Sequence, residues 1–193
     1  LWVIEQAIAD ACRWREEEIG QFKVHVNVSP HQLAQPGFID DLCGLCERFR
    51  WSPGDLGLEI TEGTLIDDLD AVNKTLARLR RRGFVISLDD FGTGFSSLAY
   101  LKSLPIDRLK IDRSFVRDIP HDAYDRTLVE ATMRIADHLG LALVAEGVEK
   151  TAQRDWLIQR GCVHMQGFLF APALSAEDLK TLLQQSIRLS ASG

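Results

Sequence analysis

Acidic side chains at the C-terminal ends of predicted strands are the residues in this chain best suited to chemistry. Glu59, Asp89 and Glu146 each end an apolar run, and Asp90 directly follows Asp89. Several carboxylates in one cleft stay ionised together only if cations neutralise them. With the Asn27 amide they form an oxygen-rich set that favours Mg²⁺ or Mn²⁺ over zinc. Two such ions, about 3.5–4 Å apart, form the clamp used for in-line displacement at phosphorus.

Lys110 is the one cation predicted at a strand end, and it lies in phase with the acidic residues. A lysine among carboxylates can be a structural salt-bridge residue. In this position it is equally suited to hold an attacking water or a phosphoryl oxygen. Asp90 has two interpretations as well, because aspartates after strands often cap helices. The acids predicted at this edge are Glu59, Glu62, Asp89, Asp90, Asp112, Glu146 and Glu149.

A repeated strand-helix pattern is predicted to position these side chains. Strands alternating with helices pair in parallel, with the helices packed on the sheet. After a helix over 1–15, apolar alternation predicts strands at 22–28, 56–60, 84–88, 108–111, 141–145 and 162–165. Helical periodicity predicts helices near 36–49, 65–82, 96–102, 123–139, 151–160 and 176–187.

The alternation of side chains within these strands favours a barrel over an open sheet. Residues two apart share a face of a strand, and one face of each predicted strand carries polar side chains. In an open sheet helices cover both faces, and buried charges there are hard to satisfy. In a (β/α)₈ barrel one face lines the interior, and the active site lies at the C-terminal rim. The polar strand-end residues are Asn27, Glu59, Asp89, Lys110, Glu146 and Gln166.

Composition limits the classes of partner. The 193 residues contain 22 Lys and Arg against 28 Asp and Glu, a formal net charge of −6. An acidic chain of this kind is a poor candidate for binding DNA or RNA polymers or for contacting an anionic membrane. Its 4 cysteines are too few for a disulfide framework. We therefore expect one domain over residues 1–193 with reduced thiols and a cytoplasmic location.

Six short motifs are spread along most of the chain, from residue 26 to residue 168. They are VNVSP at 26–30, LEITE at 58–62, DDFGTGFSSL at 89–98, LKID at 109–112, VAEGVE at 144–149 and QGF at 166–168. Through them the chain resembles the EAL-domain family of cyclic di-GMP-specific phosphodiesterases. The resemblance implies an α/β, TIM-like (β/α)₈ barrel. It also implies that the first two strands, including the Glu-Ala-Leu strand with its metal-binding glutamate, are missing before Leu1, so that the domain is N-terminally incomplete.

The resemblance also implies roles for individual residues. Asn27, Glu59 and Asp89 match ligands of one metal ion, and Asp89, Asp90 and Glu146 match ligands of the second. Lys110 matches a lysine that contacts the nucleophilic water, and Glu62 a glutamate that holds the loop after Asp89 in its active shape. The residues expected to take part in catalysis are Lys110, Glu146, Glu62 and Asp90. Those expected to bind substrate are Gln166, Glu149, Asp112, Phe170 and Pro172. Phe95 and Phe168 depart from the family pattern, in which tyrosine is common at both positions.

The implied function is hydrolysis of cyclic di-GMP to linear pGpG by two Mg²⁺ or Mn²⁺ ions that activate water, with Ca²⁺ inhibitory. The implied setting is bacterial signalling, as a homodimer within a parent protein that carries upstream sensory or cyclase domains and could be membrane-tethered. One alternative is a catalytically inactive cyclic di-GMP receptor or a protein-docking module. This would fit a polypeptide that truly starts at Leu1, because the barrel would then be open and the first metal would lack a ligand. An unrelated metal-dependent barrel of the aldolase or enolase type explains the carboxylates but not the order of the motifs.

Overall fold

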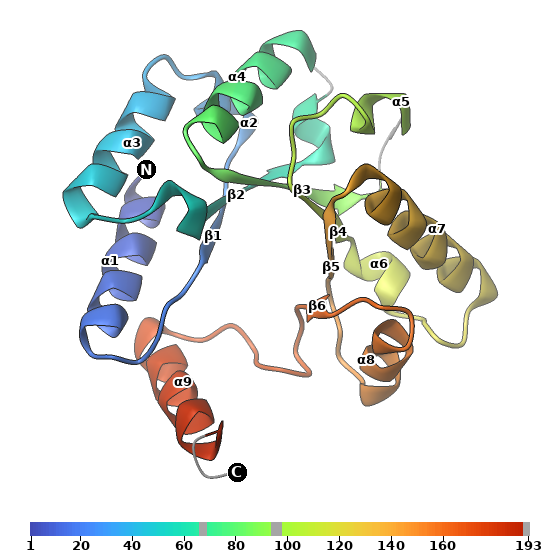
Figure 1. Cartoon of the computed structure of the whole chain (residues 1–193). Helices are drawn as coiled ribbons and strands as arrows, with labels where there is room; N and C mark the ends of the chain where they lie inside the picture. The colour runs from blue at the N-terminus through green and yellow to red at the C-terminus, as the bar shows by residue number, and fades with distance from the viewer. Residues whose placement is uncertain (66–68, 94–97, 191–193) are drawn as a thin grey trace.

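A curved sheet of parallel strands, with helices on its convex side, forms the frame of the protein (Figure 1). The computed structural model describes residues 1–65, 69–93 and 98–190. The start of the helix expected at 96–102, and Phe95 with it, lie outside these ranges. The strands are β1 (Val24–Asn27), β2 (Leu56–Thr61), β3 (Val85–Phe91), β4 (Arg108–Ile111), β5 (Ala142–Ala145) and β6 (His164–Met165).

Strand order distinguishes a barrel wall from an open doubly wound sheet. The sheet runs β1-β2-β3-β4-β5-β6, so each strand pairs in parallel with its neighbour in the chain. Doubly wound sheets reverse their strand order at a switch point, and no reversal occurs among the described strands. Within these ranges the outer edges of β1 and β6 have no strand partner, so the sheet forms a partial barrel. The predicted barrel class is confirmed.

Helices cover the convex face of the sheet. The longer ones are α1 (Trp2–Glu16), α3 (Phe38–Phe49), α4 (Leu69–Arg81), α7 (Ala123–Leu139) and α8 (Thr151–Ile158). Helix α9 (Ala176–Ser190) lies beside the C-terminal end of α1, where Lys180 pairs with Glu17. Three short helices, α2 (Pro30–Ala34), α5 (Leu98–Leu101) and α6 (Arg113–Val116), and two 3₁₀ turns, Pro53–Asp55 and Glu62–Leu65, complete the described elements. Within the described ranges, no helix combines the length and apolar character needed to cross a bilayer.

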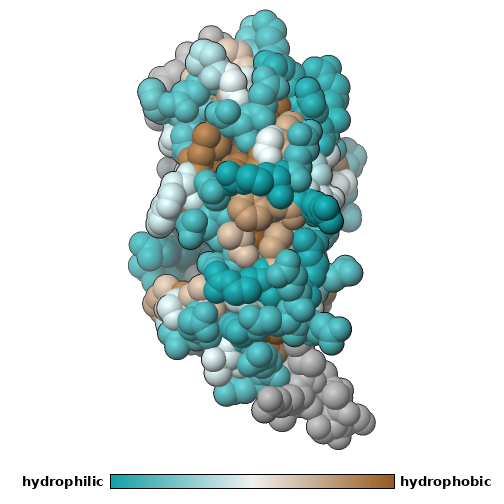
Figure 2. Space-filling model, turned by 90° about the vertical axis from the view of Figure 1, so that its left-hand side faces the viewer, coloured by the Kyte–Doolittle hydropathy of each residue, from teal (hydrophilic) through white to brown (hydrophobic). Residues whose placement is uncertain are grey.

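The strand alternation seen in the sequence sorts side chains between two environments. Leu56, Leu58 and Ile60 of β2 are almost fully buried in the core cluster shared with α3 and α4. The alternate residues of the strands, such as Glu59, turn toward the concave side. Figure 2 views the face that carries α1 and α3, and its surface is mainly hydrophilic with small hydrophobic patches. The apolar sides of the helices therefore pack inward, and the polar residues of the strands are left to line the interior.

Element boundaries differ from the sequence expectation at several short elements. The helix expected over 65–82 is a 3₁₀ turn at Glu62–Leu65 followed by α4 from Leu69. Helix α2 was not predicted, although Ser29 and Gln32 form a capping box and Pro30 occupies the first turn. Helix α6 was also missed. It begins directly after β4, where the Asp112 side chain caps it by accepting a hydrogen bond from the Ser114 N–H at 2.9 Å.

Candidate metal centre

Lys110 lies at the centre of the converging strand ends and is only 4% exposed. Its Nζ is 2.6 Å from Glu59 Oε2, 2.6 Å from Glu146 Oε1 and 3.1 Å from Asp89 Oδ2. The side chains therefore come from β2, β3 and β4 and from the residue after β5. The sequence prediction that these strand ends converge is confirmed for these four residues.

Asp89 and Asp90 reach the same site because the strand is irregular there. Consecutive residues of a regular strand point to opposite faces, so two adjacent ligands would otherwise be separated. The pairing of β3 with β4 shifts register between Leu88 and Phe91, and Asp90 has a left-handed backbone with φ 55°. The Asp90 N–H also donates to Asp89 Oδ1 at 3.0 Å. This β-bulge redirects one side chain, as bulges near functional sites often do.

Asp89, Asp90 and Glu146 form a carboxylate cluster suited to a divalent cation. Each offers one oxygen, and these oxygens lie within 4.8 Å of one another. A close set of carboxylates without histidine or thiolate is typical of hard cations such as Mg²⁺ and Mn²⁺. The Lys110 ammonium already compensates part of this negative charge. The donor set therefore fits the metal ions implied by the sequence, and Glu59 contacts the same Lys110 Nζ as Asp89 and Glu146.

The pKa shifts reflect crowded carboxylates around one cation. Burial raises the pKa of Glu146, and the hydrogen bond from Lys110 offsets this only in part. Burial together with the charges of Asp89 and Asp112 raises the pKa of Asp90. Burial by itself would lower the pKa of Lys110, but its hydrogen bonds to Glu146 and Glu59 raise it above its usual value. The site therefore holds an ammonium among carboxylates whose mutual repulsion a bound cation would relieve.

Glu62 contacts the loop that follows the aspartate pair. It is buried at 7% exposure in the turn after β2, and its Oε2 accepts a hydrogen bond from the Gly92 N–H at 3.3 Å. Thr93 closes the same turn by donating its hydroxyl to the Asp90 carbonyl at 2.9 Å. A side chain from the 3₁₀ turn after β2 is thus connected to the loop that orients Asp90.

Replacing Glu62 with Gln is expected to lower activity through the loop. The amide keeps the shape of the side chain but weakens the charge-assisted bond to Gly92, so that Asp90 is held less firmly. Outer-shell partners of metal ligands typically contribute about 10–100-fold, and we expect a loss in that range in turnover with little change in thermal stability. Steady-state kinetics and thermal unfolding check this; unchanged turnover would exclude the loop role.

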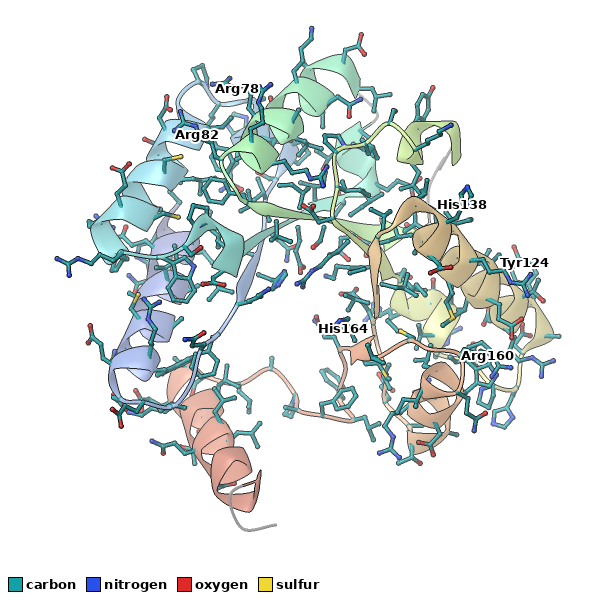
Figure 3. The ribbon with its side chains drawn as sticks, viewed as in Figure 1. Arg78, Arg82, Tyr124, His138, Arg160 and His164 are labelled. Carbon is teal, nitrogen blue, oxygen red and sulfur yellow. The ribbon has the colours of Figure 1, made fainter. Side chains whose placement is uncertain are left out.

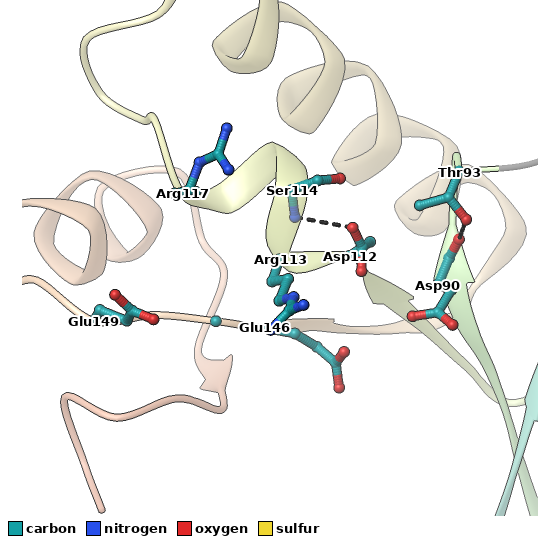
Figure 4. Close-up of a pocket in the computed structure, with 9 residues that line it drawn as sticks. Asp90, Thr93, Asp112, Arg113, Ser114, Arg117, Glu146 and Glu149 are labelled. Atoms are coloured by element: carbon teal, nitrogen blue, oxygen red, sulfur yellow. Dashed lines mark hydrogen bonds between the residues drawn. The ribbon is translucent and has the colours of Figure 1, made fainter. Parts of the chain in front are cut away.

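A cavity of about 830 Å³ opens beside the cluster (Figure 4). Of the predicted residues, Asp90, Asp112, Glu146 and Glu149 line it. Sequence reasoning missed two basic lining residues, Arg113 at the start of α6 and Arg117 at its C-cap. Their spacing of four on a helix after the LKID motif was the available signal. The wall of the cavity therefore offers cations opposite the acidic cluster.

The remaining predicted residues lie nearby or at the surface. Asn27 ends β1 directly opposite Glu59 in the strand register. The Gln166 backbone N–H donates to the Ala145 carbonyl at 2.8 Å, which places Gln166 beside the end of β5. Phe170 is 52% exposed and Pro172 is also exposed, and neither lines the cavity. Their substrate-binding roles stay predictions.

The other polar side chains of the fold are distributed differently. In Figure 3, Arg78 lies on the outer helix α4, and Tyr124 and His138 lie on the outer helix α7. The ion pairs of Lys110 with Glu59, Asp89 and Glu146 lie instead at the strand ends. The concave side at the C-terminal ends of the strands is therefore the place where charged groups from several strands meet, as in barrel enzymes.

Comparison with known proteins identifies the family. The EAL domain model matches residues 1–173. The bifunctional diguanylate cyclase/cyclic di-GMP phosphodiesterase MucR of Pseudomonas aeruginosa is 40% identical over 178 residues, which are 92% of this chain and 26% of MucR. The chain spans about a quarter of the length of the curated relatives it matches.

Solved structures agree with the sequence match. The EAL domain of Mycobacterium smegmatis DcpA has a TM-score of 0.90 at 40% identity, covering 95% of this chain and 83% of that one. The MucR phosphodiesterase in complex with c-di-GMP has a TM-score of 0.86 at 40% identity, covering 92% and 72%. The manganese/cy-diGMP complex of Klebsiella pneumoniae BlrP1 has a TM-score of 0.78 at 32% identity, covering 86% and 43%. In sequence and in fold, the chain belongs to the EAL domain family.

Proposed function

We propose that this domain hydrolyses cyclic di-GMP to linear pGpG with two divalent cations, Mg²⁺ or Mn²⁺. The observation that carries the proposal is the β-bulge that turns Asp89 and Asp90 into one site with Glu146. Four further residues of the family motif, Asn27, Glu59, Glu62 and Lys110, are present on the neighbouring strand ends and turns. The c-di-GMP complex of MucR and the manganese complex of BlrP1 support both the substrate and the cations.

The residues of the site would have three roles: binding the metal ions, orienting the attacking oxygen and lining the substrate cavity. Asn27, Glu59 and Asp89 would hold one ion, and Asp89, Asp90 and Glu146 the other. When bound, the ions would supply Lewis-acid stabilisation of the phosphate charge and lower the pKa of a water molecule. Lys110 would donate hydrogen bonds from Nζ to orient the attacking oxygen. Glu62 would hold the Gly92 loop, which fixes Asp90.

The cavity beside the cluster would receive the substrate. Glu149, Asp112, Arg113 and Arg117 line it, and a guanidinium is the group best matched to a phosphate in a bidentate contact. Gln166, Phe170 and Pro172 would contact the substrate from the segment after β6. Hydrolysis breaks one P–O3′ bond, with the water oxygen added to phosphorus and a proton passed to the leaving 3′ oxygen.

Product analysis tests this function. The protein with its native N-terminus is incubated with cyclic di-GMP and Mg²⁺, with and without EDTA, and the nucleotides are separated by chromatography. We expect pGpG to form and EDTA to prevent it. Binding of cyclic di-GMP without any product would contradict hydrolysis and favour a receptor instead.

Calcium is expected to occupy the site without supporting turnover. Ca²⁺ takes 6–8 oxygen ligands at 2.3–2.6 Å in flexible geometry, whereas Mg²⁺ demands near-octahedral geometry at 2.0–2.1 Å. The longer, looser coordination would place the reacting groups poorly, so we expect Ca²⁺ to compete with Mg²⁺ and to inhibit. Rates measured at fixed Mg²⁺ against increasing Ca²⁺ check this. Equal rates with either ion alone would count against the proposed geometry.

The proposed partners follow from the family and from the share of the relatives that the chain covers. We propose that the domain works as a homodimer, next to sensory or cyclase domains in its parent protein, on the cytoplasmic side of any membrane tether. Sedimentation of the native protein with and without cyclic di-GMP would measure the dimer directly.

A further inference from the structure

His25 lies on the N-terminal side of Asn27 on β1, next to the carboxylate cluster. The proposed mechanism gives it no role. It is two residues before Asn27 on β1, so both side chains share the concave face of the strand. Its Nδ1 is 3.5 Å from Glu59 Oε1, and its Nε2 is 3.0 Å from the Arg108 Nη1 of β4. The imidazole therefore connects a basic residue of β4 to a carboxylate of β2.

The neighbouring strand makes room for this imidazole. Gly57 stands opposite His25 in the register of β1 and β2. A Cβ at position 57 would lie 2.2 Å from His25 Nδ1, so no other residue fits beneath the ring where it now lies. Gly57 is within a strand and is not among the glycines with a left-handed backbone, so its backbone conformation does not require glycine. Because Gly57 has no side chain, the His25 imidazole can occupy this space.

The hydrogen-bond chemistry assigns a direction to this chain of contacts. A guanidinium has five donors and no acceptor, so His25 Nε2 accepts from Arg108. A neutral imidazole then carries its proton on Nδ1, where it faces Glu59 Oε1. The other oxygen, Oε2, is 2.6 Å from Lys110 Nζ. The two oxygens of Glu59 thus have different partners: His25 for Oε1 and Lys110 for Oε2.

We propose that His25 is a positioning residue for the metal centre. Held by Arg108 and seated over Gly57, it binds Oε1 of Glu59 and so presents Oε2 to the cation site. The inference rests on the proposed function, because it assigns Glu59 to a metal ion. Burial raises the pKa of Glu59, but the hydrogen bonds from His25 and Lys110 hold it below its usual value.

Direct measurement of Mn²⁺ affinity tests the proposal without depending on turnover. Titration calorimetry on the native-length protein compares wild type with His25→Phe, which keeps a planar ring and removes the donor. Loss of an outer-shell partner typically costs about 10–100-fold in metal affinity, and we expect that range here. His25→Asn keeps an N–H donor near the position of Nδ1 and is expected to restore most of the affinity.

A second set of variants separates positioning from general disturbance of the barrel. Gly57→Ala displaces the imidazole while leaving His25 in the chain, so it should lower Mn²⁺ affinity as His25→Phe does. In a His25→Ala background there is no ring to displace, and Gly57→Ala should then have no further effect on Mn²⁺ affinity. Thermal unfolding of each metal-free variant identifies those that remain folded.

The outcomes distinguish this inference from the proposed function. A folded His25→Phe protein with wild-type Mn²⁺ affinity would overturn the role of His25 and leave the metal site intact. An equal effect of Gly57→Ala with and without the ring would also overturn it. If Asp89→Asn bound Mn²⁺ with the same affinity as wild type, the proposed metal site would be overturned, and the role of His25 with it.

Discussion

Replacing Asp89 with Asn or Glu146 with Gln is expected to reduce cyclic di-GMP turnover by on the order of 10³-fold. Both carboxylates belong to the cluster that would hold the ions, and the amides keep their shape while removing the negative charge. Loss of one preorganised electrostatic contact at a reacting centre lowers kcat by about 10²–10³-fold. We expect loss of a metal ligand to lower kcat by at least the larger of these factors. Initial rates of pGpG formation at saturating Mg²⁺ measure the effect.

Matched controls for these variants lie on exposed faces of the helices. Asp137→Asn on α7 and Glu47→Gln on α3 make the same chemical changes at exposed positions away from the cavity. Both controls should turn over at the wild-type rate. Turnover within a few-fold of wild type in folded Asp89→Asn or Glu146→Gln would refute the assignment of the cluster as the reaction centre.

Replacing Lys110 with Met is expected to have the second large effect, and on stability as well as on activity. The side chain is 4% exposed and contacts three carboxylates, which the variant would leave without their cation. Removing one partner of a buried ion pair typically costs about 3–5 kcal/mol, and we expect a loss of that order in EDTA. Because a divalent ion can replace the missing charge, Mn²⁺ should recover more unfolding free energy in the variant than in wild type.

Urea unfolding with and without Mn²⁺ measures this difference, with Lys74→Met on the exposed face of α4 as control. The pH dependence provides a further check through Glu59. Burial raises its pKa, but hydrogen bonds from His25 and Lys110 bring it below the ordinary value. The stability from this carboxylate is therefore present above its unfolded pKa of about 4.3 and is lost as pH falls through the lower folded value.

The deficit of Lys110→Met should accordingly be full near pH 7 and shrink in acid. A deficit that is independent of both Mn²⁺ and pH would show that Lys110 contributes through packing rather than through charge. Turnover of the variant should also fall, because Nζ is the group proposed to orient the attacking oxygen.

The strand pattern made the convergence of the acidic residues predictable. Period-two alternation placed Glu59, Asp89 and Lys110 on the same side of successive strands, and parallel pairing brought their ends together. The structure confirms that convergence through the contacts of Lys110. Alternation alone would have sent Asp90 to the opposite face, and the bulge that brings it back has no reliable marker in one sequence.

Contacts that depend on side chains reaching across strands were not predictable. The contact between His25 and Arg108 joins β1 and β4, which are not adjacent in the sheet. In the sequence, Gly57 indicates only a glycine that weakens a strand. Helix α6 is too short to show a helical periodicity in the sequence. The basic residues Arg113 and Arg117 that line the cavity were therefore not predicted. These features depend on three-dimensional fit rather than on local pattern.

A crystal structure of the native-length protein with Mn²⁺ and cyclic di-GMP tests the central claim most directly. Anomalous scattering locates each manganese ion independently of the refined coordinates. We expect two peaks, both about 2.0–2.2 Å from an Asp89 carboxylate oxygen, one beside Asn27 and Glu59 and one beside Asp90 and Glu146. Cyclic di-GMP bound in the cavity without manganese at Asp89 would contradict the account.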